Sequence, residues 1–360
     1  MKMKIEILEQ PTDDLAWDEF LAAQPAGHHV QSSPWGQLKA KYAWQVVRII
    51  ATECGHIVGG AQVLMRRLPV WGRVGYITRG PVVASGRHDV MEALFDRIEQ
   101  VARAKRLLIL SIEPPAHESL YMQPLNVRQF RPSSFYVIPP TTVVVDLRQS
   151  EDEVLAQFKR GTRYNVGLAL RKGIVVREGN ETDLPKLFEW MKDTAAENPY
   201  YFYDLAYYQE VWRLFAPRGM LKLLMACFED EPISGIIVLA LGHWAVYKWG
   251  ASSGAHLAKK PNDLLQWHGI RWSRDKGCHY YDLGGITPSV AEALQRGEEP
   301  PEGKGTGIAR FKLGFGQMVS FPSSYDNSYG IRPRWLVRKG VDYGWKLKFL
   351  RNVARGARLT

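Results

Sequence analysis

Lys304-Gly305-Thr306-Gly307-Ile308-Ala309-Arg310-Phe311-Lys312-Leu313-Gly314-Phe315-Gly316 is the stretch from which the fold of this chain is best worked out. Most of the segment from Gly307 to Gly314 predicts a short helix, with Ile308 and Phe311 facing inward and Arg310 facing outward. The glycines that precede it leave backbone N–H groups free at a helix start, where negative charge is favourable. We therefore expect a charge-binding element here.

Lys312 follows an aromatic residue and lies between glycines. A lysine in this setting is suited to hold its charge beside a developing oxyanion. The same sequence is also compatible with a solvated lysine in a glycine-rich connection, because short Gly-rich motifs often occur by chance. Upstream, Tyr280-Tyr281-Asp282-Leu283-Gly284-Gly285-Ile286 predicts a strand that runs into a glycine turn. The two segments together favour the functional interpretation.

The composition describes a globular protein of 360 residues, with 46% hydrophobic residues, twelve tryptophans and a net charge of +10. This length permits two domains of ordinary size. No apolar run approaches the ~18 residues that span a bilayer, and the N-terminus has no signal-peptide core. The cysteines are too few for a disulfide framework or a zinc site and fit a reducing cytosol, most simply as small buried residues: Cys54, Cys227 and Cys278. We expect a cytoplasmic protein without a metal.

The first half of the chain alternates short strands with amphipathic helices. Residues 45–53 and 57–67 predict a hairpin, and a helix over 88–105 leads into a strand over 107–112. Thr12 and Ser33 are suitable N-caps for two earlier helices. A strand over Thr142–Asp146 is expected to close this half.

The second half repeats the first. Ile174–Glu178 predicts a strand, Asp183-Leu184 opens a helix as Asp14-Leu15 does, and Ile233-Ser234-Gly235 corresponds to Val58-Gly59-Gly60. The offset is roughly 170 residues, which indicates one duplicated unit. The order of elements predicts a mixed α/β fold in which helices cover mixed sheets. We place the domains at 1–150 and 151–330, with a separate segment at 331–360.

Two basic regions are candidates for anionic partners. The stretch Phe158–Lys172, in the helical block that Ser150 begins, is either a solvated basic face or a surface for phosphates. The segment from Ile331 to the end mixes basic residues with tryptophan and leucine. Packing on the body, binding at a membrane surface and binding of RNA all remain open for it.

Five motifs in this order resemble the Fem family of peptidoglycan aminoacyltransferases. They are the two segments above together with Gln31–Lys39 (QSSPWGQLK), Thr162–Asn165 (TRYN) and Pro261–Trp267 (PNDLLQW). The resemblance covers roughly residues 30 to 325. It implies two tandem acetyltransferase-like (GNAT-like) domains, and it implies the armless type, since no long heptad segment occurs.

The resemblance also implies a reaction. An aminoacyl-tRNA, the co-substrate in place of a cofactor, would be attacked by the stem-peptide amine of a UDP-linked or lipid-linked precursor, adding Ala, Ser or Gly. Such direct transfer suits a chain in which no nucleophile elbow, P-loop or dinucleotide fingerprint appears. We expect a monomer, cytoplasmic or peripheral at the inner face of the membrane.

Residue roles follow from the resemblance. Lys312 would stabilise the oxyanion and Phe311 would bound the acyl pocket, whereas Lys39, in its pattern with Trp35, would hold the precursor's diphosphate. The other substrate-binding candidates are Arg163, Tyr164, Asn165, Tyr247 and Arg310. Asp282 is either a general base or the cap of a turn.

One position departs from the family. Asn198–Tyr203 lacks the arginine that the family uses there for the diphosphate, and Arg163 or Arg213 are substitutes. Two other functions compete with the Fem interpretation. One is an acyl-CoA-dependent N-acyltransferase on the same fold, and the other is a non-catalytic protein that binds RNA or a membrane surface.

Overall fold

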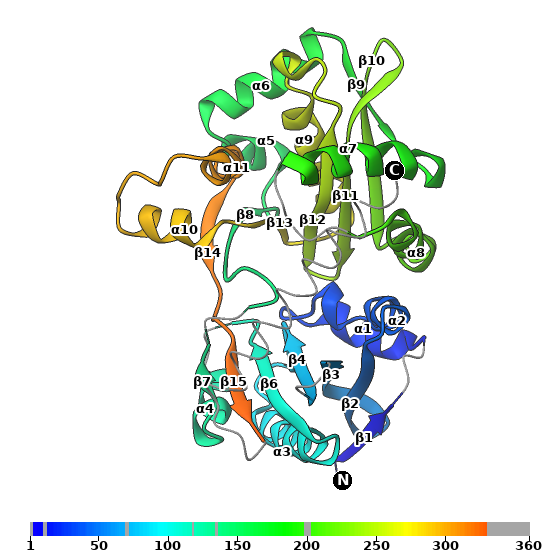
Figure 1. Ribbon diagram of the computed structural model, residues 1–360, viewed down its shortest axis with the longest axis vertical. Coiled ribbons are helices and arrows are strands. Elements are labelled where there is room, and N and C mark those ends of the chain that lie inside the picture. Colours follow the sequence, from blue (N-terminus) through cyan, green and yellow to red (C-terminus); the bar gives the residue numbers. More distant parts are fainter. Residues whose placement is uncertain are drawn as a thin grey trace. The chain divides into compact units, whose positions relative to one another are not determined.

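The computed structural model describes residues 3–9, 13–68, 72–116, 119–133, 136–197 and 203–329. These residues form two compact units. The first takes the chain up to residue 137, apart from residues 27–29, and takes it again from Pro322. The second takes residues 27–29 and 138–321. Each unit is a mixed sheet with helices on it (Figure 1).

Among the described residues the first unit has an eight-stranded sheet. Its strands, in spatial order, are β1 (Lys4–Leu8), β2 (Gln45–Glu53), β3 (His56–Leu68), β4 (Gly72–Thr78), β6 (Leu107–Glu113), β15 (Tyr325–Ser328) and β7 (Arg131–Pro132), while β5 (Val82–Val83) pairs with β3. Its helices are α1 (Leu15–Ala23), α2 (Ser33–Lys41), α3 (His88–Ala104) and α4 (Ser119–Val127), and the short 3₁₀ turn η1 (His29–Gln31) precedes α2.

The second unit, as far as it is described, has a seven-stranded sheet. Its strands, in spatial order, are β9 (Ile174–Glu178), β10 (Leu221–Phe228), β11 (Glu231–Leu241), β12 (Trp244–Ser252), β13 (Tyr280–Gly285), β8 (Thr141–Asp146) and β14 (Gln317–Ser320). Its helices are α5 (Glu151–Ala156), α6 (Arg160–Arg171), α7 (Leu184–Glu197), α8 (Leu205–Phe215), α9 (Pro261–Asp275), α10 (Pro288–Gln295) and α11 (Lys304–Lys312), with 3₁₀ turns η2 (Glu181–Asp183), η3 (Ala216–Arg218) and η4 (Leu257–Lys259).

The two sheets repeat one strand order. In the first, β1 to β4 run antiparallel to their neighbours and β6 then pairs parallel with β4. In the second, β9 to β12 run antiparallel and β13 pairs parallel with β12. The predicted pair of glycines holds equivalent places, because Gly60 faces Ile50 across the first hairpin and Gly235 faces Met225 across the second. A mixed α/β fold with a repeated unit is therefore what the chain forms.

The strand at Thr141–Asp146 lies in the other unit from the one expected. We predicted that it closes the first half, yet β8 pairs with β13 and β14 in the second sheet. Val143 and Val145 are fully buried in the second core. The place beside β6 is instead taken by β15, from the far end of the chain. The predicted boundaries at 150 and 330 therefore do not coincide with the two units, since a strand pattern does not reveal which sheet a strand joins.

Smaller differences concern helix ends and faces. The cap of α2 is Ser32, not Ser33, and the cap of α1 is Asp14, whereas Thr12 lies outside the described residues. Ile308 is exposed instead of inward, because Thr306 and Ala309 turn the buried face of α11 elsewhere. Among the cysteines, Cys227 and Cys278 are buried as expected but Cys54 is exposed on the turn between β2 and β3. The segment 331–360, with its predicted roles, lies outside the described residues.

Candidate functional site

The second sheet divides where β12 and β13 separate. The two parallel strands pair only through Trp244, Ala245 and Val246, the last of which faces Asp282. Beyond this point β12 continues to Ser252 without β13, which turns away at Gly284, a residue with φ +82°. A left-handed glycine fits because it has no side chain to clash. The β12–β13 ladder thus ends at Val246 and Asp282, while Gly285 of β13 still pairs with Thr142 of β8.

Lys312 reaches this division from the last turn of α11. Its Nζ donates a hydrogen bond to the carbonyl oxygen of Gly285 at 2.8 Å. A Cβ atom on Gly284 would lie 3.4 Å from the same Nζ and 3.7 Å from the Tyr247 carbonyl oxygen. The ammonium therefore lies between the ends of the two strands. Burial lowers its pKa to about 8, although the charge of Asp282 acts in the opposite direction.

Asp282 is buried and holds the turn that follows it. Its Oδ1 accepts hydrogen bonds from the backbone N–H of Gly284, at 2.7 Å, and from the hydroxyl of Thr142. These bonds match the turn-cap alternative for Asp282. Because the carboxylate also opposes the charge loss of Lys312, we interpret it as a group that positions the turn and supports the lysine.

A second lysine lies at the division and was not singled out by the sequence analysis. Across β11 and β12, Ile237 faces Trp249 but Val238 faces Tyr247, so Lys248 is the extra residue of a β-bulge. Bulges redirect side chains and are frequent beside active sites. Burial lowers the pKa of Lys248 to about 8, and the charge of Asp282 again opposes this change. The charge of Asp282 thus acts on the pKa of two lysines near the end of the β12–β13 ladder.

Phe311 fixes the helix that carries Lys312. Its ring packs edge-on against Phe315 at 5.1 Å, and Phe315, which is fully buried, packs in turn against Phe158 at 5.0 Å. Gly314 and Gly316 allow the motif to lie close to its neighbours. A Cβ on Gly314 would meet the side chain of Thr162, and a Cβ on Gly316 would meet the backbone of β8. The aromatic residues of the motif therefore anchor it to the core of the second unit, and the predicted acyl-pocket role of Phe311 stays a prediction.

Helix α6 begins against the same motif. The backbone N–H of Lys159 donates to the carbonyl oxygen of Gly314 at 2.8 Å. Arg163 donates to the backbone carbonyls of Ala156 and Phe158 at the end of α5, and Asn165 donates to Asp263 of α9 at 3.0 Å. The TRYN motif therefore positions α6, with Tyr164 left 60% exposed on its outer face.

The remaining candidates of the second unit lie around this region. Tyr247 precedes the bulge, and its ring folds back over Gly250, where a Cβ would be 2.6 Å from the hydroxyl oxygen. Arg310 is exposed on the last turn of α11. Arg213, predicted as one of two candidates to replace the missing arginine, pairs with Glu210 on α8 at 3.0 Å. Residues 198–202 of the departing segment lie outside the described residues.

Lys39 and Trp35 belong to the first unit. Lys39 is only 7% exposed, and its Nζ lies 4.5 Å from the centre of the Trp35 ring. This distance is within the range of a cation–π contact. Lys39 is therefore not a solvated helical lysine, whereas its diphosphate role stays a prediction.

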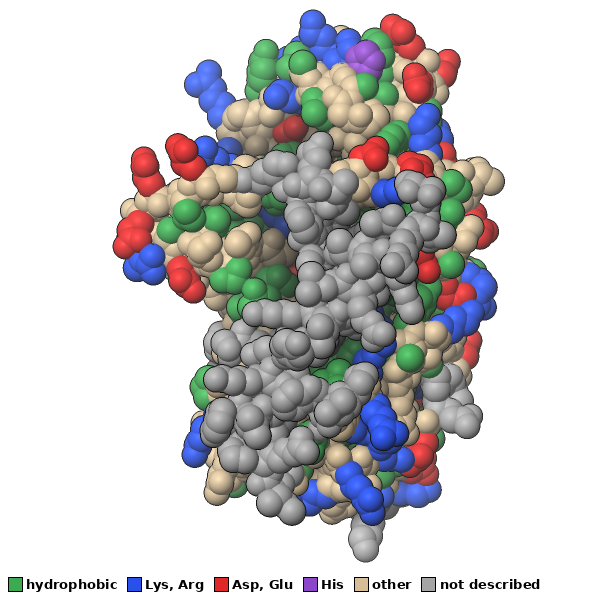
Figure 2. All heavy atoms as spheres, viewed as in Figure 1, with side chains coloured by type: hydrophobic (Ala, Val, Ile, Leu, Met, Phe, Trp, Pro, Cys, Tyr) green, Lys and Arg blue, Asp and Glu red, His purple; other side chains and the backbone are tan. Residues whose placement is uncertain are grey.

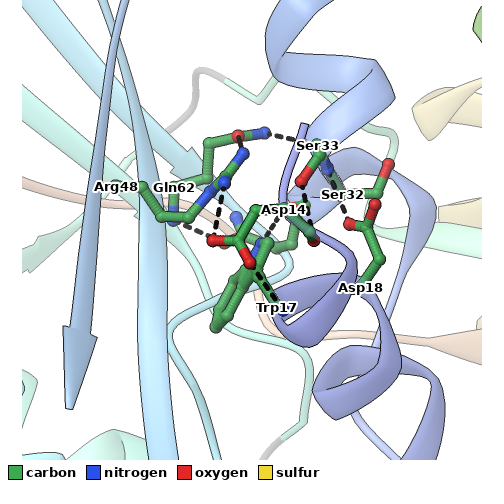
Figure 3. A network of polar contacts seen from close by, with 8 residues as sticks. Asp14, Trp17, Asp18, Ser32, Ser33, Arg48 and Gln62 are labelled. Carbon is green, nitrogen blue, oxygen red and sulfur yellow. Dashed lines mark hydrogen bonds and ion pairs between the residues drawn. The ribbon is translucent and has the colours of Figure 1, made fainter. Parts of the chain in front are cut away.

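A buried polar network holds the helix that carries Lys39 (Figure 3). Gln31 donates to the carbonyl oxygen of Thr78 and accepts from the backbone N–H of Gln62, both at 2.7 Å. The Gln62 amide donates to the carbonyl oxygen of Ser32 at 3.1 Å, and the N–H of Ser33 donates to Asp18 at 2.7 Å. These bonds explain why the QSSPWG motif needs its polar residues.

Arg48 is the charged centre of this network (Figure 3). Its guanidinium is 1% exposed and donates to Asp14 at 3.3 Å and to Gln62 at 3.2 Å. Burial lowers its pKa, against the opposing charges of Asp14 and Asp18. Gly36 completes the arrangement, because a Cβ there would be 2.5 Å from the Gln62 side chain. Neither Arg48 nor Gln62 was predicted from the sequence.

The described residues hold no group of three His, Cys, Asp or Glu side chains that could bind a metal. Within the same residues, no helix combines the length and apolar character that a membrane span requires.

Comparison with known proteins agrees with this geometry. Residues 12–129 match the FemAB family and residues 156–299 match the acetyltransferase (GNAT) domain. Lipid II:glycine glycyltransferases of Staphylococcus haemolyticus and Staphylococcus epidermidis are 22% and 23% identical over 74% of this chain and 82% of their own length. The crystal structure of FemX aligns with a TM-score of 0.78 and 20% identity, covering 90% of this chain and 97% of FemX. The resemblance to the Fem family is confirmed.

The predicted fold of two GNAT-like domains is confirmed as well. Further solved structures share the tandem arrangement at lower similarity, including L-PGS from Bacillus licheniformis, with a TM-score of 0.57 and 13% identity over 94% of this chain and 97% of that one. A tandem GNAT protein from the clavulanic acid biosynthesis pathway aligns with a TM-score of 0.52. At these identities the solved structures establish the fold alone. The named relatives are glycyltransferases, which agrees with the predicted class of enzyme, an aminoacyltransferase.

The five motifs that carry the resemblance thus fall into two groups. GIARFKLGFG, YYDLGGI and TRYN meet in the second unit around Lys312, and PNDLLQW is joined to TRYN by the Asn165–Asp263 hydrogen bond. QSSPWGQLK forms the Lys39 helix of the first unit. Lys248, Arg48 and Gln62 were not predicted from the sequence. Alternation would place Lys248 on the face opposite Tyr247, and only the bulge, which the letters do not show, redirects it.

Proposed function

We propose that this chain transfers a small amino acid, with glycine the first candidate and Ala or Ser the others, from aminoacyl-tRNA to the stem-peptide amine of a peptidoglycan precursor. The observation that carries the proposal is the placement of Lys312 between the ends of β12 and β13, with Asp282 and Lys248 beside it. A cationic group at an opening of the sheet suits a reaction that develops negative charge on an acyl oxygen.

The reaction needs little covalent chemistry from the protein. The amine nitrogen attacks the ester carbonyl carbon, and the carbonyl oxygen becomes an oxyanion. When the intermediate collapses, the bond from that carbon to the ribose oxygen breaks and the nitrogen keeps the acyl group. The amine loses a proton and the ribose oxygen gains one. Lys312 would stabilise the oxyanion and, with a pKa of about 8, is also suited to donate a proton to the ribose oxygen.

Lys248 would act as a second cation at this site. Burial lowers the pKa of both lysines, and the charge of Asp282 opposes this change for each of them. Because Lys248→Met removes one positive charge from the proposed site, it should lower kcat by about tenfold. An unchanged kcat would remove Lys248 from the mechanism.

The acceptor is proposed from the relatives and from the first unit. The staphylococcal relatives are named for transfer to lipid II, which favours a lipid-linked precursor over a UDP-linked one. Lys39 is a candidate for the diphosphate that both precursors carry. A lipid-linked acceptor would bring the protein to the inner face of the membrane as a peripheral, monomeric enzyme that needs no cofactor beyond the charged tRNA.

The test is a transfer assay with purified protein. Glycyl-, alanyl- and seryl-tRNA are each combined with lipid II or with UDP-linked pentapeptide, and products are identified by mass spectrometry. A mass increase of one amino acid on a precursor, lost in Lys312→Met, supports the proposal. Acyl-CoA donors are run in parallel, and transfer from them but not from any charged tRNA would overturn it in favour of an N-acyltransferase.

A further inference from the structure

The outer face of α6 carries positive charge and an exposed aromatic ring. Arg160, Arg163, Tyr164, Leu170 and Arg171 share one side of the helix, as their spacing of three, four and seven residues requires. Tyr164 is 60% exposed and Leu170 is 57% exposed. From Gln157 to Arg177 the sequence contains no acidic residue. This face differs from an ordinary solvated helix, in which acids and bases alternate.

The chemistry of this face matches nucleic acid. The Arg171 guanidinium lies 5.6 Å from the centre of the Tyr164 ring, so a cation and an aromatic plane stand together at the surface. Arginine and lysine bind phosphates, and tyrosine provides a plane on which a base stacks. Figure 2 shows Lys and Arg side chains with apolar ones between them over α6, at the upper left of the second unit.

The neighbouring acids do not neutralise the face. Those of α5 lie at its first turn, whereas its last turn meets the start of α6. Glu153 is held by the cap at Ser150, and Glu151 pairs with Arg271 at 3.0 Å. The turn η4, which packs beside α6, adds Lys259 and the exposed Leu257.

The face starts at the proposed reaction site. Lys159, which precedes α6, is hydrogen-bonded to Gly314 of the Lys312 motif, and Thr162 of the first turn packs on the same glycine. From there α6 extends for about 18 Å. A ligand whose end reacts at Lys312 and whose body carries phosphates would find binding groups along this helix.

We propose that the outer face of α6 binds the acceptor arm of the donor tRNA. Tyr164, one turn from the start of the helix, contacts the single-stranded 3′ end. Arg171, in the last turn, and Lys172, the residue that caps the helix, contact phosphates of the stem. The proposal rests on the proposed function, because it takes the donor to be an aminoacyl-tRNA. It adds which surface recognises the RNA outside the reacting ester.

The test compares a long and a short donor. Full-length aminoacyl-tRNA has a stem that reaches Arg171 and Lys172, whereas an aminoacylated dinucleotide that ends in the same adenosine has none. The double variant Arg171→Ala/Lys172→Ala should raise the KM for tRNA by about tenfold and leave that for the dinucleotide unchanged. Tyr164→Ala should raise both.

The matched control is Lys186→Ala/Lys192→Ala on α7, which removes the same charge from exposed lysines of the same unit. It should leave both KM values unchanged, and thermal unfolding should confirm that every variant is folded. The proposal is overturned if the α6 double variant keeps its KM for tRNA, or if both double variants lose affinity equally, since that would be an effect of net charge.

Direct binding separates this proposal from the proposed function. Binding of uncharged tRNA by the full chain is measured at a series of salt concentrations. In the α6 double variant the slope of log K against log salt concentration should become shallower, by the amount expected for the loss of about one to two phosphate contacts. If the wild type binds tRNA through α6 but transfers nothing from it, the proposed function fails and the surface stands. If binding to anionic vesicles but not to tRNA depends on α6, the face is a membrane surface and this proposal fails.

Discussion

The two sheets of this protein share a strand order and differ at their parallel strand pair, β4–β6 in the first and β12–β13 in the second. We call this pair the joint of each sheet. In the first sheet β4 and β6 pair from Arg73 to Thr78. In the second, the equivalent strands β12 and β13 pair over three residues and then part. The first joint is closed by main-chain hydrogen bonds, while the second leaves a carbonyl for Lys312 and places a bulge beside it. One repeated topology thus has an extended parallel strand pair in the first sheet and a short one in the second.

The charged residues follow the same division. The first unit buries Arg48 in a network of hydrogen bonds that fixes α2 and Lys39 (Figure 3). The second unit holds Lys312 and Lys248 with lowered pKa values around a single carboxylate. Networks of the first kind rigidify a structure, whereas perturbed groups of the second kind cluster at sites of chemistry. Under the proposed function, the first unit would bind a substrate and the second would carry the reacting group.

The largest expected effect concerns the joint of the second sheet. Lys312→Met keeps the side-chain length and removes the charge, so kcat should fall by about 10²–10³, as for loss of an oxyanion partner. The KM for the precursor should change little, because the charge acts mainly in the transition state. Steady-state kinetics of the variant and of Lys192→Met, an exposed lysine on α7, measure this. A defect confined to KM would show that Lys312 only binds substrate.

The next largest effect concerns the buried polar network of the first unit. Gln31→Ala removes two buried hydrogen bonds and leaves the Thr78 carbonyl and the Gln62 N–H without these partners. The free energy of unfolding should fall by about 2–4 kcal/mol, since an unsatisfied buried group costs about 1–3 kcal/mol. Denaturant unfolding of the variant, with Gln100→Ala on the exposed face of α3 as control, measures the difference. Equal midpoints for the two variants would mean that the network does not stabilise the first unit.

Lys39 tests the assignment of binding to the first unit. A point charge on a diphosphate contributes about 1–3 kcal/mol, so Lys39→Ala should raise the KM for the precursor by about tenfold with kcat nearly unchanged. Lys41→Ala, exposed on the same helix, is the control. A loss in kcat as large as that of Lys312→Met would break the proposed division between the units.

The smallest effect is on stability and depends on pH. Lys312 has a pKa of about 8 in the folded protein against 10.5 for an ordinary lysine, so the unfolded chain binds more protons between these values. Stability should therefore rise with pH across this window, and the cost of the buried charge is full below pH 8. Lys312→Met should raise the free energy of unfolding at pH 7 by on the order of 1 kcal/mol. Thermal unfolding at pH 7 and above pH 10 measures the gain, which should vanish at the higher pH; a less stable variant at pH 7 would contradict it.

Much of this arrangement follows from local sequence patterns. The hairpin at 45–67, the helix at 88–105 and the turn after Asp282 were predicted because alternation, amphipathic spacing and glycine each act over a few residues. The exposure of Ile308 was mispredicted, since which face of a short helix is buried depends on partners such as Phe158 that lie far away in sequence. The Lys39 helix was located, but Arg48 and Gln62, which hold it, come from strands with no polar pattern of their own.

The site itself was predicted only in part. Lys312, Asp282 and the TRYN helix were named from motifs, and the structure brings them to one joint. Lys248 was not predicted, because a β-bulge depends on how two strands pair and cannot be inferred from the sequence of either strand alone. Arg163 was named for substrate, but its guanidinium caps the end of α5, a role that depends on where α5 stops.

The position of β15 has a consequence for how the protein is made. The first sheet lacks the strand between β6 and β7 until Tyr325–Ser328 arrives, and these residues emerge from the ribosome after the whole second unit. Domains usually fold from the N-terminus as they are synthesised. Here the first unit has to wait with an unpaired edge on β6 while the second, whose strand β8 is already in place, completes itself. The half of the protein that is synthesised first is therefore the half that finishes folding last.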